Sequence, residues 1–175
     1  PLERSSETST LSQKTSPIVA GILIIHFALQ ILIPLRFTLY PGNLFWTEEG
    51  YRFSWRVMLM EKAGYTTFEV YNPQTERRWE VANWDYLTEN QEKMMATQPD
   101  MILQFAHYLE DQYQKQGMSD LKITAESYVT LNGRRSKLMI DPTVDLTEIE
   151  RGFKDKKWIL PFHKSEVHPS DLHTK

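Results

Sequence analysis

The sequence predicts an α+β protein in which one transmembrane helix is followed by a small domain with an antiparallel sheet and packed helices. Three observations lead to this prediction. The apolar run from Pro17 to Leu35 approaches the roughly 20 residues that a bilayer span needs. Strand patterns then precede and follow a helical block, a grouping typical of α+β domains. The second group contains Asn132-Gly133, which favours a tight hairpin turn because both residues adopt positive φ readily.

The composition of the chain limits its classes of function. Its 175 residues carry a formal charge of -3 with scattered Lys and Arg, so we expect no nucleic-acid partner. The absence of Cys excludes disulfides, Cys-based zinc sites and thiol nucleophiles. The length allows one ordinary domain plus an anchor. Because the first residue is Pro1 and not Met, we expect a fragment or a processed chain.

The N-terminal part divides into a lead-in and an anchor. Residues 1–16 are polar and lack apolar periodicity, which predicts a disordered lead-in. Residues 17–36 form the predicted transmembrane helix, and Pro34 is expected to bend or end it. His26 and Gln30 share one helix face, which we expect to meet other transmembrane helices of a larger parent protein. The alternative is a buried helix of a soluble protein.

The predicted domain, residues 37–162, begins with an aromatic stretch from Asn43 to Trp55. Its five aromatic and three charged side chains are Phe45, Trp46, Tyr51, Phe53 and Trp55 with Glu48, Glu49 and Arg52. Aromatic side chains that combine an apolar ring with a polar tip concentrate at membrane–water boundaries. We therefore expect this stretch to lie where the anchor leaves the bilayer.

The first group of predicted strands forms a meander. We expect one strand from Phe53 to Met60 and a second from Tyr65 to Tyr71, which is rich in β-branched and aromatic residues. The residues Asn72-Pro73-Gln74-Thr75 predict a turn. The third strand returns from Arg77 to Val81.

Two helices are predicted in the central block. The first begins at Glu89, because Thr88 and Gln91 have the spacing of a capping box. The second runs from Pro99 to about Gln116 with an apolar face, and Gly117 ends it.

The last part of the domain is predicted to be a hairpin followed by an apolar segment. Leu121 to Leu131 alternates like a strand, and Arg134 to Ile140 returns after the Asn132-Gly133 turn. The segment from Trp158 to Phe162 is expected to pack back onto the domain. Residues 163–175 are polar and predict a loose tail.

Few residue patterns indicate chemistry on their own. Adjacent Glu48 and Glu49 cannot both face one site on a regular element, and we interpret them as a solvated acidic turn. The histidines show no metal-ligand spacing, so we expect no metal site. Composition alone explains Tyr51 by packing within the aromatic cluster. The sequence contains no Gly-rich phosphate loop and no G-x-S-x-G motif.

Arg134, Arg135 and Lys137 form a small basic cluster just past the predicted hairpin turn. One interpretation is a charged strand edge that resists aggregation. The other is a site at which an extended acidic peptide adds to the strand edge. The residues alone leave both interpretations open.

Three motifs occur in order along the chain. They are W-T-E-E-G-Y-R-F-S-W at 46–55, N-G-R at 132–134 followed by D-P-T-V-D at 141–145, and W-I-L-P at 158–161. This set resembles the W-T-x-x-x-Y-x-[YF]-S-W, N-D-R…D-P-x-V-D and W-x-x-P elements of the vitamin K-dependent gamma-carboxylase family, including its bacterial HTTM-type relatives. The resemblance covers roughly residues 17–162, and the apolar helix falls where the family has its last transmembrane helix.

The resemblance implies a multispanning membrane enzyme, a carbon–carbon lyase, whose C-terminal part is an extracytoplasmic or lumenal domain. Such an enzyme oxygenates reduced vitamin K to make a strong base, which removes the γ-proton of a protein Glu before carbon dioxide adds. By this resemblance, Tyr51 lies near the vitamin and is the catalytic candidate, while Trp46 and Trp55 shape that region. The segment from Tyr128 to Arg134, with Arg135 beside it, corresponds to the region that binds the protein substrate.

The sequence departs from the family pattern in a way that bears on activity. The family's catalytic lysine lies in an N-terminal membrane region, and neither Lys14 nor Lys62 nor a later lysine matches it. We therefore expect that this chain alone does not carboxylate Glu and holds no cofactor, and that its parent uses reduced vitamin K. The alternative is a membrane-tethered peptide-binding or structural module without catalysis. The charged residues on the two sides of the apolar helix are too balanced to predict which end faces the cytoplasm.

Overall fold

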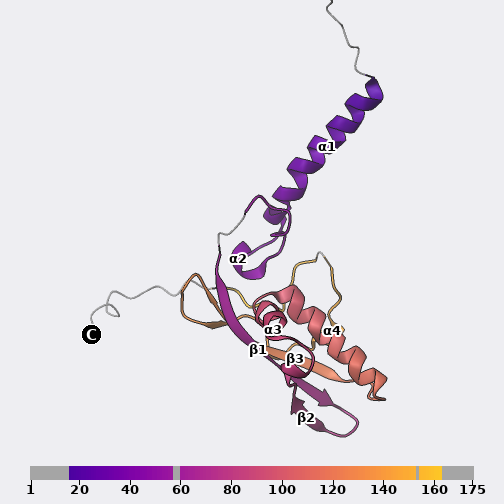
Figure 1. The fold of residues 1–175 in the computed structure, drawn as a ribbon, viewed down its shortest axis with the longest axis vertical. Coiled ribbons are helices and arrows are strands. Elements are labelled where there is room, and N and C mark those ends of the chain that lie inside the picture. The colour runs from indigo at the N-terminus through magenta and orange to yellow at the C-terminus, as the bar shows by residue number, and fades with distance from the viewer. Residues whose placement is uncertain (1–15, 57–59, 153, 163–175) are drawn as a thin grey trace, which may run out of the picture.

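The computed structural model describes residues 16–56, 60–152 and 154–162. A four-stranded antiparallel sheet carries helices on one face, which confirms the predicted α+β class. The apolar helix extends away from this domain at its N-terminal end (Figure 1). The predicted lead-in up to residue 15 and the predicted tail from residue 163 lie outside the described residues.

The apolar run forms the predicted helix α1 (Pro17–Leu35), and the 3-10 turn η1 (Arg36–Leu39) continues it. Pro17 occupies the first turn, where a missing backbone N–H costs nothing. Pro34 lies next to the end of α1 and is its buried residue. Among the described residues, this is the one helix that is long and apolar enough to cross a membrane, by length and composition.

Two long strands, β1 (Lys62–Asn72) and β3 (Lys122–Leu131), pair along their length and form the centre of the sheet. The strands β2 (Arg77–Glu80) and β4 (Lys137–Leu138) are the edges, in the order β2-β1-β3-β4. Over most of β1 and along β3, buried side chains alternate with more exposed ones. This alternation leaves one face of the sheet for helices to cover and the other for solvent.

Helices α3 (Glu89–Met95) and α4 (Pro99–Lys115) cover the buried face (Figure 1). The predicted capping box starts α3, because Thr88 Oγ1 accepts from the Gln91 amide and Gln91 Oε1 accepts from the Thr88 amide. The buried side chains of α4 are Pro99, Ile102, Leu103, Phe105, Ala106, Leu109 and Tyr113. The remaining elements are the helix α2 (Leu44–Thr47) and the 3-10 turns η2 (Asn83–Asp85) and η3 (Leu146–Glu148).

The Asn132-Gly133 turn forms as predicted, with positive φ at both residues. The returning strand β4 has only two residues, whereas the prediction ran from Arg134 to Ile140. Ile140 forms a bridge with Ile159 instead, so the C-terminal apolar segment lies beside the end of the hairpin. Trp158 and Ile159 are buried there, as expected for a segment that packs back onto the domain.

The strand predicted from Phe53 to Met60 is wrong for the residues that the structure describes. Phe53 has a φ of 65°, which an extended strand does not allow. The amide of Ser54 donates to the carbonyl oxygen of Tyr51 at 3.0 Å, as in a turn. Residues 57–59 lie outside the described residues. The predicted meander is therefore a hairpin of β1 and β2 alone.

Candidate functional site

The aromatic stretch folds into a short helix and a tight loop beneath α1. Asn43 caps the start of helix α2, because its side-chain oxygen accepts a hydrogen bond from the Phe45 amide at 3.0 Å. The helix ends at Glu48, which has a left-handed φ of 59°. This left-handed residue turns the chain, and the residues after it fold back onto η1.

Gly50 holds this loop against the end of the apolar helix. Its φ is +71°, and a Cβ added there would lie 2.7 Å from the Cα of Phe37, so no other residue fits without a shift. Two cation–π contacts extend the junction. The guanidinium carbon of Arg36 lies 5.9 Å from the Phe53 ring centroid, and that of Arg56 lies 4.4 Å from the Phe37 ring centroid.

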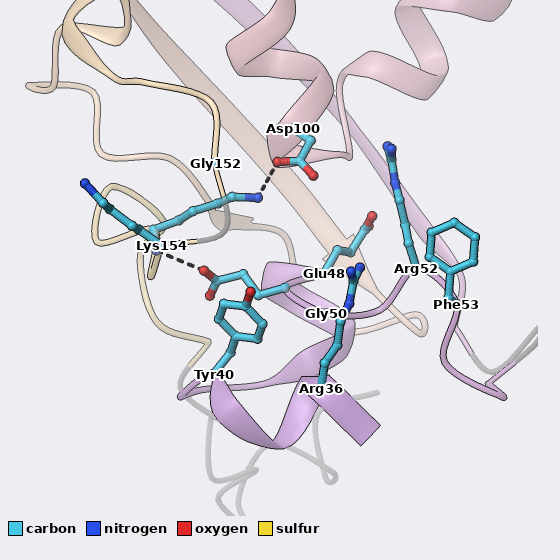
Figure 2. Close-up of a pocket in the computed structure, with 11 residues that line it drawn as sticks. Arg36, Tyr40, Glu48, Gly50, Arg52, Phe53, Asp100, Gly152 and Lys154 are labelled. Atoms are coloured by element: carbon cyan, nitrogen blue, oxygen red, sulfur yellow. Dashed lines mark hydrogen bonds and ion pairs between the residues drawn. The ribbon is translucent and has the colours of Figure 1, made fainter. Parts of the chain in front are cut away.

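A cavity of about 260 Å³ opens at this junction (Figure 2). Its lining comes from η1 and the residue after it, the loop after α2, the start of α4 and the C-terminal loop. The lining residues are Arg36, Tyr40, Glu48, Glu49, Gly50, Arg52, Phe53, Asp100, Gly152, Lys154 and Lys156. Figure 2 shows Arg36 and Tyr40 on one side and Asp100 across from them. Seven of these eleven residues are of charged types, so the cavity can offer charged groups to a polar ligand.

Glu48 forms an ion pair with Lys62, the first residue of β1. The Nζ–Oε1 distance is 2.7 Å, and the two side chains are 5% (Lys62) and 18% (Glu48) exposed. Lys62 Nζ also donates to the carbonyl oxygens of Trp46 at 2.9 Å and Thr97 at 3.3 Å. Burial lowers the pKa of Lys62, and the nearby Glu48 carboxylate opposes this change. Lys62 thus connects α2, β1 and the link between α3 and α4.

Glu49 is also buried, at 5% exposed. Its Oε1 accepts a hydrogen bond from the backbone amide of Lys156 at 2.9 Å. Burial raises the pKa of Glu49, while the hydrogen bond from the Lys156 amide lowers it. The Lys156 ammonium in turn pairs with Asp100 in the first turn of α4. A carboxyl group in this environment holds its proton to higher pH than a solvated Glu does.

The interpretation of Glu48 and Glu49 as a solvated acidic turn is therefore wrong. The argument that neighbours cannot face one site applies to regular elements, and the left-handed φ of Glu48 ends the helix there. Both residues line the same cavity, although each carboxyl group has a different partner.

The predicted aromatic site residues occupy different environments. Trp46 is fully buried, and its indole N–H donates to the carbonyl oxygen of Leu160 at 2.8 Å. Tyr51 is half-buried with its ring edge-on to Phe45, and Trp55 is 71% exposed. None of Trp46, Tyr51 and Trp55 lines the cavity at the foot of α1.

The predicted substrate-binding residues near the hairpin lie on more than one surface. Tyr128 stacks on Tyr65, with 5.6 Å between ring centroids, on the sheet face opposite the helices. Arg135 is exposed in the loop before β4. These two residues therefore present themselves to solvent and not to the charged cavity.

Arg134 is connected to the aromatic stretch through Phe162. Its guanidinium carbon lies 5.7 Å from the Phe162 ring centroid, and Lys137 Nζ lies 5.2 Å from the same centroid. Phe162 packs against Trp46 with 4.8 Å between ring centroids. The hairpin and the W-T…S-W segment, far apart in sequence, thus meet through one phenyl ring.

Sequence reasoning missed Lys62, Asp100 and Lys156. Their partners meet them only in the folded chain, so no local spacing reveals them. The one available signal was Asp100 in the first turn of a predicted helix, where carboxylates are favoured by the helix dipole.

The histidines and carboxylates of residues 16–56, 60–152 and 154–162 form no group of three or more that could hold a metal ion. His107 on α4 instead hydrogen-bonds through Nε2 to the carbonyl oxygen of Leu146 at 3.0 Å. That contact joins α4 to η3, which is a structural role.

Comparison with known protein families places most of the chain in one of them. Residues 15–165 match the sequence model of the vitamin K-dependent gamma-carboxylase lumenal domain. Neither the curated proteins nor the solved structures that were searched gave a match. The matched region covers most of the chain and contains the whole junction described above. The chain therefore belongs to the vitamin K-dependent gamma-carboxylase lumenal-domain family.

Proposed function

We propose that the chain is the C-terminal part of a membrane gamma-glutamyl carboxylase-like enzyme, which couples quinol oxidation to carboxylation of protein Glu. The observation that carries this proposal is the family match over residues 15–165. The apolar helix α1 supports it, because a helix of this length and composition suits a membrane anchor. In this proposal, the sheet domain lies on the extracytoplasmic or lumenal side and the reacting quinol comes from the parent's membrane region.

The charged cavity does not fit a quinone with an apolar tail. Its volume is about 260 Å³ and seven of its eleven lining residues are charged, so we derive no chemical step through a quinone there. The proposed part of this chain is to position the substrate and to form one wall of the reaction site. Tyr51 packs on Phe45 and lies in the chain between Gly50 and Arg52, which line the cavity, and it is the residue that we propose to act directly.

The test is turnover by the intact membrane protein that contains this chain. Incorporation of labelled carbon dioxide into a Glu-containing peptide, in the presence of reduced vitamin K, is compared between wild type and Tyr51→Phe. We expect turnover to fall by about a hundredfold, the low end of what a proton-transfer group contributes, with no change in the melting temperature. Tyr108→Phe, on the exposed side of α4, is the matched control.

Two results would count against this proposal at different levels. Unchanged turnover in Tyr51→Phe removes this tyrosine from the mechanism and leaves the enzyme class intact. Absence of quinol-dependent carboxylation in the wild type overturns the proposed function itself.

A second candidate is a membrane-tethered peptide-binding module without catalysis. The observation that favours it is the short edge strand β4, where Arg134 and Lys137 flank the Phe162 ring. Such an edge suits an extended acidic peptide. Binding of a Glu-rich peptide should then weaken at least about tenfold in Arg134→Ala with Arg135→Ala, as expected when charge-assisted contacts are lost. Unchanged peptide affinity in this double variant would contradict the candidate.

A further inference from the structure

Three large apolar side chains are left in solvent just beyond α1. Leu39 is 81% exposed, Phe53 is 76% exposed and Trp55 is 71% exposed. Single exposed apolar residues are common on soluble proteins. A group of them in one place indicates a surface that is covered by a partner or a membrane.

Contacts already described bring these residues to one region. Leu39 belongs to η1, and Phe53 lies against Arg36, the first residue of η1. Trp55 is followed by Arg56, which packs on Phe37 in the middle of η1. All three residues therefore belong to the segments that meet at the end of α1, whose own apolar side chains are also exposed. We call Leu39, Phe53 and Trp55 the boundary surface.

The charges around the boundary surface favour a phosphate-bearing partner. Among the carboxyl groups that line the cavity with Phe53, Glu49 is buried, Glu48 is paired with Lys62 and Asp100 is paired with Lys156. Arg52, which precedes Phe53 in the chain, is exposed. An exposed arginine beside exposed aromatic rings matches the headgroup region of a bilayer, which takes amphipathic rings and binds cations through its phosphates.

We propose that the boundary surface enters the headgroup region of the phospholipid bilayer that holds α1, with Arg52 binding lipid phosphate. This inference rests on the proposed membrane placement of α1. It adds a second contact between domain and membrane, so the domain is held at a fixed tilt and the charged cavity opens at the membrane surface. If α1 were the only contact with the membrane, the tilt of the domain relative to the bilayer would not be fixed.

The experiment places the complete chain in phosphatidylcholine vesicles whose acyl chains carry bromine, which quenches tryptophan fluorescence at short range. Wild type is compared with Trp55→Phe and with Trp84→Phe. Trp84 is the matched control, because it is 76% exposed but belongs to η2 on the domain. We expect Trp55→Phe to remove most of the bromine-dependent quenching and Trp84→Phe to leave it unchanged. Quenching should be stronger with bromine near the headgroups than at the bilayer centre.

Flotation of the same vesicles distinguishes a failure of the proposed membrane placement of α1 from a failure of the proposed insertion of the boundary surface. If the chain floats and Trp55→Phe removes no quenching, the boundary surface lies in water or under another protein segment, and this inference is overturned while the anchor stands. If the chain does not float, the membrane placement and this inference both fail. Arg52→Gln tests the phosphate contact, because it should reduce Trp55 quenching by headgroup-proximal bromine, and equal quenching would remove Arg52 from the surface.

Discussion

Glu48 and Glu49 are adjacent in the sequence, but their carboxyl groups lie in different environments. Glu48 accepts a hydrogen bond from the Lys62 ammonium, whereas Glu49 accepts one from a backbone amide. The first is therefore paired with a cation, whereas burial raises the pKa of the second and favours its protonated form. Adjacent acids of the same type thus have distinct electrostatic roles at the edge of one cavity.

The Lys62–Glu48 pair gives a stability prediction. We expect Lys62→Met to lower the free energy of unfolding by about 3 kcal/mol, because the variant leaves a partly buried carboxylate without its cation. Urea denaturation followed by circular dichroism measures the change. Lys122→Met, at an exposed position of β3, is the control and should change stability by less than about 0.5 kcal/mol. Equal stability of the two variants would show that the pair is not structural.

The raised pKa of Glu49 gives a prediction about pH. The native state keeps a proton on Glu49 at pH values where the unfolded chain, with the ordinary pKa of 4.5, has lost it. The stability that this proton supplies is present below pH 4.5 and is lost as the pH rises through the folded-state pKa. Glu49→Gln is neutral at every pH, so its stability relative to wild type should increase over that window.

Urea denaturation at a series of pH values from about 4 to about 8 measures this difference, since the slope reports bound protons. Glu126→Gln, at an exposed position of β3, is the control and should show a nearly constant difference. A constant difference for Glu49→Gln as well would contradict the raised pKa.

The elements predicted correctly are those whose determinants lie close together in the chain. The capping box at Thr88 and the turn at Asn132-Gly133 each depend on a few consecutive residues. The loop after α2 depends instead on the contact between Gly50 and η1, which alternation of apolar residues does not encode. This is why the strand prediction was wrong at Phe53 and Ser54, where the described chain forms a turn.

The same contact gives a prediction for the loop as an element. Gly50→Ala should lower the free energy of unfolding by about 2 kcal/mol, because the added Cβ meets the Phe37 backbone and the left-handed φ becomes strained. Thermal and urea unfolding measure this loss. Gly152→Ala is the control, because its nearest neighbour would be 4.0 Å away and its φ is not left-handed. A Gly50→Ala variant as stable as the control would mean that the loop can move away from η1 without cost.

Across the whole molecule, α2 is the joint between three distant parts of the chain. Gly50 and its loop contact η1, Lys62 contacts Glu48 and Trp46, and Trp46 reaches Leu160. The family motif could be found from sequence because its residues are contiguous. Its partners could not be found, because Trp46 and Leu160 are separated by 114 positions and only the fold brings them together.

This joint gives a prediction for the whole domain. Trp46→Phe should lower the free energy of unfolding by about 2 kcal/mol, because the carbonyl group of Leu160 loses its donor and the smaller ring leaves a void. The amide of Leu160, which donates to Met139 at 2.8 Å, should also exchange its hydrogen faster in the native state. Trp55→Phe is the matched control, because its exposed ring makes no comparable core contact, and its effect should stay within about 0.5 kcal/mol. If both variants lose the same stability and leave exchange at Leu160 unchanged, Trp46 does not fasten the C-terminal segment, and the family motif acts at the membrane boundary alone.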